Sequence, residues 1–321
     1  MIISKTAICR RTALRGFGAT LAWQLLNRDK GFYGVAKAAT PVATAPIDVK
    51  SIKSRGSRKV EIVYKSPHTA PNGLQATKEG LWIVDDRTVN GANYVSLINF
   101  SDGKIVREFT VSGLSAPSGM TVDANNALWI NSTHSGLIFN CSSEDGKVLA
   151  KYASPGNGTI YHLKGDPPQA RSPLAPAFPR PVEPARNAAG VRPALPPGQV
   201  PLTTDAAPRG EGGQGMEFRD GLLYTAILPT RRVYVLDPKT WEVQAMWQLA
   251  GNRAHGVGWE DDTLWVADTN WRTFFRHDRK TGEIVEKIQL TEKDPLIHGV
   301  TIHDGYIWYC DDMGYICNFK L

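Results

Sequence analysis

Two histidines and three aspartates stand at repeated positions in this sequence and carry side chains that can do chemistry. His255 and His298 each precede a glycine, whereas Asp85, Asp268 and Asp311 each follow a tryptophan by three positions. Imidazole can bind a substrate or act as a general acid or base near neutral pH. Aspartate oxygens are ligands for hard divalent cations such as Mg²⁺ and Ca²⁺. This pattern is typical of a site where histidine moves protons and the aspartates are metal ligands.

The residues before the glycine in the other copies of this pattern are polar as well. They are Asn72, Ser118 and Gln214. If these positions meet in space, they form a polar ring around a concave site, where small-molecule ligands commonly bind. We therefore predict that Asn72, Ser118 and Gln214 bind substrate together with His255. The alternative is that each aspartate accepts hydrogen bonds from loop backbone and each polar residue only begins a turn.

These positions recur because the body of the chain is a repeat. Each copy has a glycine followed by an apolar residue, with an aromatic residue nine or ten positions after the glycine. The five glycines are Gly73, Gly119, Gly215, Gly256 and Gly299, at spacings of 46, 96, 41 and 43 residues. A period of about 40 to 45 residues with four short strands is typical of a β-propeller blade. We predict an all-β chain that forms five four-stranded blades.

The last copy ends at Leu321 after only three strands. Residues 59–65 are apolar enough to supply the missing outer strand, which would close the ring and remove exposed strand edges. The propeller is therefore predicted to span 59–321. Because neighbouring strands in a blade run antiparallel, the residue before each glycine and the residues after each aromatic are expected at the same rim.

One segment inside the propeller does not follow the repeat. Residues 166–213 contain twelve of the 21 prolines, and proline disfavours regular strands. We predict a Pro-rich insertion between the second and third blades, and a degenerate sixth blade is the alternative. Since the insertion leads directly into Gln214, it belongs to the same rim and is either a lid or a flexible linker.

The N-terminal 38 residues have the features of an export signal. Arg10 and Arg11 precede a weakly apolar run at 16–26, and residues 36–38 supply a small-residue cleavage pattern. We predict a twin-arginine signal peptide over 1–38, a linker over 39–58 and a periplasmic or secreted mature protein. An ordinary amphipathic first helix is the alternative.

Charge and hydropathy disfavour two classes of partner, nucleic acids and the interior of a membrane. Lys and Arg number 37 against 31 Asp and Glu, but residues 1–38 alone hold seven bases and one acid, so the remainder is neutral. A neutral body disfavours nucleic-acid binding. The sequence contains no apolar stretch of about 18 residues, so no membrane-spanning helix is predicted.

Cys310 and Cys317 flank a predicted turn. They form either a disulfide or two reduced thiols.

The copies around the two histidines resemble the repeats of streptogramin lyase-type propellers. The matching residues are His255-Gly256-Val257 with Leu264-Trp265, and His298-Gly299-Val300 with Ile307-Trp308. More loosely, they resemble the lactonases of the regucalcin and gluconolactonase type. The resemblance implies that His298 is the general acid/base, His255 a substrate contact and Asp311 a metal ligand.

A five-bladed ring also resembles bacterial and plant glutaminyl cyclotransferases. The nearest counterpart of their Gly-Glu-Gly inner-strand motif is Gln214-Gly215-Met216-Glu217. We place this resemblance behind the other two because the Gly-Glu-Gly motif itself is missing.

Two functions from different classes remain. The first is a metal-assisted lyase or hydrolase that acts on a small cyclic ester, lactone or sugar-derived substrate, with a divalent cation, Mg²⁺ or Ca²⁺, polarising a carbonyl. The second is a non-catalytic propeller that binds a ligand or a protein. It is favoured by the absence of a G-x-S-x-G nucleophile motif and of a phosphate-binding G-x-x-x-x-G-K motif.

Overall fold

A computed structural model describes residues 33–34, 45–158, 160–163, 165–175, 199–201 and 212–321 of the chain. The predicted signal peptide and its cleavage site therefore fall almost entirely outside the described residues, as does most of the Pro-rich insertion. Within the described ranges, no helix has the length and apolar character needed to cross a membrane.

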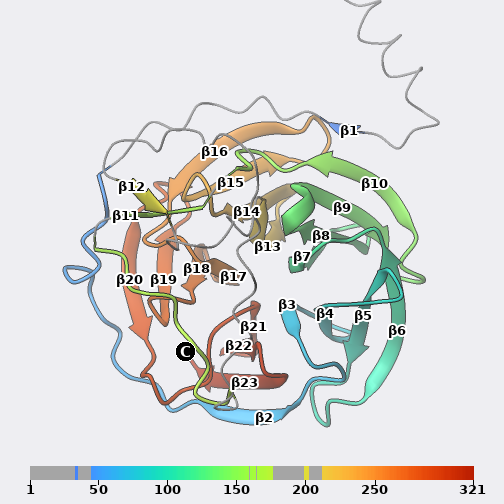
Figure 1. The fold of residues 1–321 in the computed structure, drawn as a ribbon, viewed down its shortest axis with the longest axis horizontal. Helices are drawn as coiled ribbons and strands as arrows, with labels where there is room; N and C mark the ends of the chain where they lie inside the picture. The colour runs from blue at the N-terminus through green and yellow to red at the C-terminus, as the bar shows by residue number, and fades with distance from the viewer. Residues whose placement is uncertain (1–32, 35–44, 159, 164, 176–198, 202–211) are drawn as a thin grey trace, which may run out of the picture.

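Five four-stranded antiparallel sheets form the body of the molecule and stand as blades around a centre (Figure 1). Blade 1 contains β3 (Pro71–Thr77), β4 (Gly80–Val89), β5 (Ala92–Ile98) and β6 (Ile105–Ser112), and blade 2 contains β7 (Pro117–Val122), β8 (Ala127–Ser132), β9 (Leu137–Ser142) and β10 (Val148–Ala153). Blade 3 contains β13 (Gly213–Arg219), β14 (Leu222–Ile227), β15 (Arg232–Asp237) and β16 (Glu242–Gln248), and blade 4 contains β17 (Ala254–Glu260), β18 (Thr263–Asp268), β19 (Thr273–Asp278) and β20 (Ile284–Gln289). The predicted five-bladed β-propeller is confirmed.

Blade 5 is built from both ends of the chain. Its inner three strands are β21 (Val300–His303), β22 (Tyr306–Asp311) and β23 (Tyr315–Lys320), and its outer strand is β2 (Glu61–Lys65). β2 pairs antiparallel with β23, with Glu61 opposite Asn318. The predicted closure by an N-terminal strand is therefore confirmed, and it pairs the edge of β23 that the last copy would otherwise leave open.

The repeated glycines are needed because the inner strands touch their neighbours. A Cβ on Gly73 would lie 2.1 Å from the Ser118 carbonyl oxygen, and one on Gly119 would lie 2.0 Å from the Gln214 carbonyl oxygen. Gly256 and Gly299 are also crowded, since a Cβ would lie 2.5 Å from Val300 of blade 5 and 2.7 Å from the Asn72 carbonyl oxygen of blade 1, whereas Gly215 is less tight, at 3.0 Å from blade 4. At the four tightest positions a larger residue would push two blades apart.

The repeated aromatic residues join the same pairs of blades at a larger radius. Trp82 packs with Leu128 and Phe139 of blade 2, and Trp308 packs with Leu74 and Ile83 of blade 1. Trp129, Tyr224 and Trp265 make the matching contacts with blades 3, 4 and 5. All five aromatic side chains are buried. The tryptophans of the repeat are therefore core residues, as their apolar surface favours.

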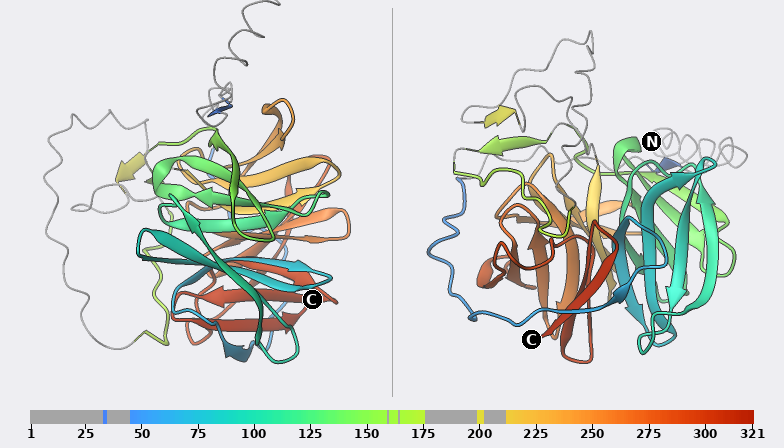
Figure 2. Two further views of the ribbon diagram at one scale, coloured as in Figure 1. Left: turned by 90° about the vertical axis from the view of Figure 1, so that its right-hand side faces the viewer. Right: turned by 60° about the horizontal axis from the view of Figure 1, so that its bottom comes forward.

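The insertion forms a short sheet of its own where it is described. β11 (Tyr161–Leu163) pairs antiparallel with β12 (Gln199–Pro201). Figure 2 shows both strands standing off one face of the blades. The described residues give this sheet two strands, so the alternative of a sixth four-stranded blade finds no support in them.

The segment predicted as a linker packs along blade 4 over its described part, 45–58, and runs around the outside of the propeller towards β2 (Figure 1). Ser54 forms an isolated parallel bridge with Lys287 on β20, and Val49 joins Ala250 and Phe275 in a small apolar cluster. We call residues 45–58 the N-terminal arm. A short strand that precedes it, β1 (Tyr33–Gly34), pairs with β10.

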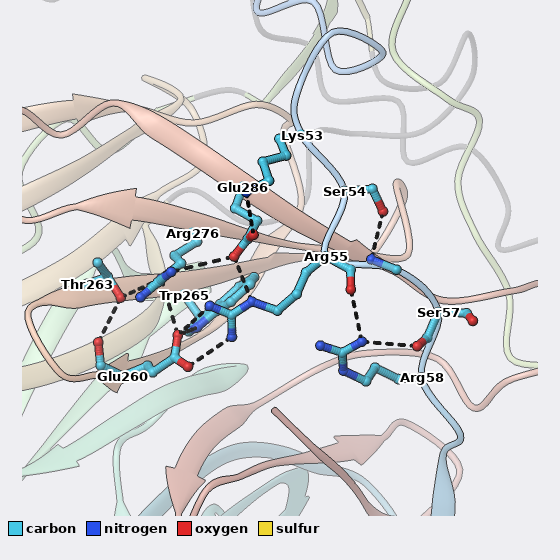
Figure 3. A network of polar contacts seen from close by, with 11 residues as sticks. Lys53, Ser54, Arg55, Ser57, Arg58, Glu260, Thr263, Trp265, Arg276 and Glu286 are labelled. Carbon is cyan, nitrogen blue, oxygen red and sulfur yellow. Dashed lines mark hydrogen bonds and ion pairs between the residues drawn. The ribbon is translucent and has the colours of Figure 1, made fainter.

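Arg55 anchors this arm through a network of charged groups on blade 4 (Figure 3). Its Nε donates to Glu286 Oε2 at 2.6 Å, and its Nη1 donates to Glu260 Oε1 at 2.9 Å. Arg276 lies 3.2 Å from Glu260 Oε2 and shares both carboxylates. The Arg55 guanidinium also lies over the Trp265 ring, 5.1 Å from its centroid. Two partly buried bases thus face two partly buried acids, and the exposed Lys53 adds a longer contact to Glu286 at 3.9 Å.

The cysteines of blade 5 are free thiols. Cys310 lies opposite Ile316, whereas Cys317 lies opposite Tyr309. Adjacent residues point to opposite sides of a strand, and the two thiols accordingly pack in different apolar clusters. Cys310 and Cys317 are therefore two reduced thiols, which is the second of the two alternatives considered from the sequence.

Candidate functional site

The residues before the five glycines gather at one end of the ring of inner strands, and we call this end the mouth. The inner strands β3, β7, β13, β17 and β21 lie nearest the centre (Figure 1). The strand register brings the start of each inner strand level with the end of the next strand, since Pro71 pairs with Asp85 and Ala254 pairs with Asp268. The predicted common rim is therefore present.

His255 and His298 meet face to face at the mouth. Their ring centroids are 4.5 Å apart and the ring planes differ by 15°. Both side chains are buried, with residue exposures of 3% and 9%. Residues that stand at equivalent positions of neighbouring blades are spatial neighbours, which is why the repeat brings these two rings together.

A hydrogen bond sets the tautomer of His298. Asn72 Nδ2 donates to the Pro117 carbonyl oxygen at 2.9 Å, so Asn72 Oδ1 is the atom that faces His298 Nδ1, also at 2.9 Å. An amide oxygen only accepts, so His298 Nδ1 must carry the hydrogen. In the neutral ring, Nε2 is then the nitrogen that can take up a proton. Asp312 Oδ2 lies 4.0 Å from this Nε2.

A hydrogen bond sets the tautomer of His255 as well. The Thr269 hydroxyl donates to the Ile297 carbonyl oxygen at 2.6 Å, so its oxygen accepts from His255 Nδ1. Burial lowers the pKa of His255 well below the ordinary value, and the charge of Arg253, together with that of His298 when it is protonated, lowers this pKa further. His255 is therefore neutral at pH 7 with Nε2 as a hydrogen-bond acceptor.

The three aspartates predicted as metal ligands hold loops instead of facing one another. Asp268 accepts from the backbone N–H groups of Arg253 and Trp271, at 2.9 and 3.0 Å. Asp85 accepts equivalent hydrogen bonds from Ala70 and Arg87, at 2.8 and 2.9 Å.

Asp311 shows the same arrangement with one further partner. Met313 N–H donates to Asp311 Oδ1 at 2.7 Å, and Oδ2 accepts from Leu296 N–H and, at 2.7 Å, from the Ser172 hydroxyl. Burial raises the pKa of Asp268 and of Asp311 despite these hydrogen bonds. Among the described residues, no group of three or more His, Cys, Asp or Glu side chains is placed to hold a metal ion. The three carboxylates thus fit the role of hydrogen-bond acceptors for loop backbone better than that of cation ligands. The metal site stays a prediction.

The structure adds Thr269 and Asp312 to the residues of the mouth. Both stand four positions after the tryptophan of their repeat, one place beyond Asp268 and Asp311. Each lies beside the histidine of its own blade. Reading the repeat one residue further along would have found them, because consecutive residues leave a strand in different directions.

Ser118 and Gln214 complete the ring on blades 2 and 3. Their residue exposures are 1% and 7%. Ser118 Oγ and Gln214 Oε1 are buried, and neither has a hydrogen-bond partner in the part of the chain that the structure describes. The Gln214 carbonyl accepts from Asn131 Nδ2 at 2.6 Å, which fixes the backbone at this point. The ring therefore has unused hydrogen-bonding capacity on the two blades that precede the histidines.

The described start of the insertion crosses the rim above blades 3 to 5, and we call residues 165–175 the rim strap. Arg231 donates to both oxygens of Asp166, at 2.6 and 3.0 Å. Ala170 N–H donates to Asn270 Oδ1 at 3.1 Å, and Ser172 reaches Asp311. The rim strap is thus held to the loops of three successive blades.

A second polar ring lies two residues beyond the glycines, further along the inner strands. It contains Glu217 with Gln75, Thr121 and Thr301. Burial raises the pKa of Glu217 to about 8, although hydrogen bonds from the Phe218 backbone, Gln75 and Thr121 act in the opposite direction. At neutral pH this carboxyl is mostly protonated and uncharged.

Comparisons with known proteins agree with the fold. No family model matches the sequence, and no curated protein matches it either. The fold is similar to that of the glutaminyl cyclase of Myxococcus xanthus, with a TM-score of 0.52 and 10% identity over 82% of this chain and 97% of that chain. The virginiamycin B lyase of Staphylococcus aureus aligns with a TM-score of 0.44 and 15% identity, over 83% of this chain and 100% of that chain.

At these identities the likeness to the cyclase shows the fold alone, so the class defined here is a five-bladed β-propeller. Propellers of this kind carry unrelated functions. The function must therefore be argued from the mouth.

Proposed function

We propose that this propeller is a lyase or hydrolase that cleaves a small cyclic ester, lactone or sugar-derived substrate at the mouth. His298 is the general acid/base and His255 is a substrate contact. The observation that carries this proposal is the stacked pair itself, in which both rings have Nδ1 committed and Nε2 able to accept. Paired, buried and oriented histidines are more typical of a site than of a core.

The chemistry follows from the His298 tautomer. In a hydrolase, His298 Nε2 takes a proton from the water molecule that attacks the ester carbonyl, the acyl carbon–oxygen bond breaks, and the departing alcohol oxygen receives the proton from Nε2. In a lyase, Nε2 takes a proton from the carbon adjacent to the one that bears the ester oxygen, and the C–H electron pair forms a carbon–carbon double bond. The alkyl carbon–oxygen bond breaks, and the departing carboxylate accepts the proton from Nε2 or from solvent. No electrons leave or enter the substrate. Asp312, 4.0 Å from Nε2, favours the protonated ring electrostatically.

Two parts of the proposal rest on other observations. Export to the periplasm or beyond is proposed from Arg10, Arg11 and the small-residue pattern at 36–38. Binding of a divalent cation is a separate proposal, and none of the chemical steps described above involves a metal ion. The hydrogen bonds that occupy Asp85, Asp268 and Asp311 favour the alternative of a non-catalytic binding propeller if no turnover is found.

The experiment is a turnover screen of cyclic esters and lactones with three proteins. They are the full chain, its His298→Gln variant and a His68→Gln variant, in which a histidine of the blade 1 periphery is changed instead. We expect at least about a hundredfold loss of kcat/KM in His298→Gln and none in His68→Gln. Equal turnover by all three proteins, or none by any, would contradict the assignment.

A further inference from the structure

The rim strap crosses from blade 3 to blade 5, where its last contact lies (Figure 1). This contact is the hydrogen bond that the Ser172 hydroxyl donates to Asp311 Oδ2 at 2.7 Å. Ser172 is buried, whereas its neighbours Arg171 and Pro173 are exposed. The strap thus turns this hydroxyl inward, onto the blade that carries His298.

Asp311 joins the strap to both sides of the proposed acid/base. Its Oδ2 also accepts from the N–H of Leu296, two residues before His298, and its Oδ1 accepts from the N–H of Met313 at 2.7 Å. Met313 follows Asp312, the carboxylate that lies 4.0 Å from His298 Nε2. One side chain therefore ties the segment that carries the ring to the turn that carries its carboxylate.

The equivalent aspartates of blades 1 and 4 hold their turns without a hydroxyl. Asp85 and Asp268 each accept from two backbone N–H groups, and neither has a further hydrogen-bond partner among the described residues. A turn of this kind therefore forms without a side chain from the strap. The Ser172 hydroxyl is an addition at blade 5, next to the proposed acid/base.

An ionised Asp312 cannot hold its own position as its counterpart in blade 4 does. Thr269 stands at the same repeat position and bonds both to His255 Nδ1 and to the Ile297 carbonyl oxygen. A carboxylate has no hydrogen to donate to a carbonyl. When both are ionised, it is also repelled by the adjacent Asp311. A hydrogen bond from a hydroxyl to Asp311 offsets part of this repulsion.

We infer that Ser172 is a positioning residue of the site, because through Asp311 it holds the turn that places Asp312 beside His298. This inference rests on the proposed function, in which His298 is the acid/base. It makes the described start of the insertion part of the site. The acid/base is then fully oriented only while the rim strap is bound to blade 5.

The first test follows the backbone of the turn and needs no substrate. Amide hydrogen exchange is measured by NMR on the full chain and on its Ser172→Ala variant. The Met313 amide reports on the Asp311 turn, and the Trp271 amide, bonded to Asp268 in blade 4, is the internal control. We expect exchange at Met313 to become at least about tenfold faster and exchange at Trp271 to stay unchanged. Unchanged exchange at Met313 overturns the inference.

The second test is the split between kcat and KM on the substrate found in the screen. Ser172→Ala should lower kcat by about tenfold at unchanged KM, because Asp312 acts on the charged imidazole that forms in the transition state. A strap that only covers the substrate predicts the opposite, a raised KM at unchanged kcat, and that result overturns the inference.

Two further variants control this comparison. Ser172→Thr keeps the hydroxyl and should restore most of the kcat. Ser96→Ala removes a buried serine hydroxyl that donates to Glu108 at 2.8 Å in blade 1, and it should change neither constant. A Ser172→Thr protein that regains slow exchange at Met313 but not the kcat contradicts the positioning role.

The ¹⁵N signals of the His298 ring separate this inference from the proposed function. Ser172→Ala should move them, because Asp312 is no longer held beside the ring, whereas the signals of His255 should change little. This shift without turnover by any protein supports the positioning role and contradicts the lyase or hydrolase. Turnover that His298→Gln abolishes and Ser172→Ala leaves unchanged supports the enzyme and contradicts the positioning role.

Discussion

Asn72 Oδ1 accepts a hydrogen bond from His298 Nδ1 at 2.9 Å, across the junction where the last blade meets the first. The contact joins two parts of the chain that are 226 residues apart in sequence. It therefore exists only when the ring is closed, and it ties the orientation of the proposed acid/base to the completed propeller.

The first prediction concerns this orienting contact. Asn72→Leu removes the acceptor and lets the neutral His298 ring populate the other tautomer, so kcat/KM should fall by about tenfold or more. Asn72→Asp keeps an oxygen at this position and should restore most of the activity. Kinetics on the lactone found in the screen check both variants. Similar losses in Asn72→Leu and Asn72→Asp would show that Asn72 does not act through the tautomer.

The second prediction concerns the stability of the protein against pH. The Glu217 carboxyl has a folded pKa of about 8 against an ordinary value of 4.5. Between these two values the folded chain binds more protons than the unfolded chain, so the contribution of Glu217 to stability falls as the pH rises through this window. Glu217→Gln cannot ionise and should be more stable than the parent by an amount that grows from pH 4.5 to pH 8.

Urea unfolding at several pH values measures this difference in free energy. Glu61→Gln, an exposed carboxyl on β2, is the control and should show no such growth. A constant difference between Glu217→Gln and the parent would mean that Glu217 is already ionised in the folded protein.

The third prediction concerns the N-terminal arm. Arg55→Met keeps the apolar part of the side chain but leaves the partly buried Glu260 and Glu286 short of a cation. We expect a loss of about 1 to 3 kcal/mol in the free energy of unfolding. Lys59→Met breaks an ion pair whose two side chains are mostly exposed and should change stability little. Equal effects of the two variants would show that the network contributes no more than a surface pair.

The fourth prediction concerns the inner-strand glycines. Gly119→Ala places a Cβ 2.0 Å from the Gln214 carbonyl oxygen, a distance that only separation of blades 2 and 3 can relieve. We expect a loss of more than about 3 kcal/mol or failure to fold. Gly91→Asn is the control, since Gly91 has a φ of 80° and open space around it, and asparagine tolerates this conformation. Thermal unfolding compares the two, and a stable Gly119→Ala protein would contradict the close approach.

The blades were predictable from the sequence because the two repeat markers report contacts between blades. A glycine is required where Gly119 meets Gln214, and a large aromatic residue is required where Trp82 fills the gap to blade 2. The pairing of His255 with His298 followed from the same period. These features are local in each repeat, so a pattern search can find them.

Other features of the site depend on which way a side chain leaves the backbone. The sequence pattern pointed to Asp268 and Asp311, whereas the residues beside the histidines are the next ones along, Thr269 and Asp312. The contact of Arg55 with Glu260 joins residues 205 positions apart and follows no repeat. Such contacts become visible only when the blades are placed in space.

The claim that both imidazoles carry hydrogen on Nδ1 and leave Nε2 able to accept is the basis of the whole account. ¹⁵N NMR of the histidine rings tests it most directly, with His255→Gln and His298→Gln used to assign the signals. At pH 7.5 we expect both residues to show the tautomer with hydrogen on Nδ1, and His255 to remain neutral when the pH is lowered to 5.5. Hydrogen on Nε2 of His298, or a charged His255 at pH 5.5, would contradict the account.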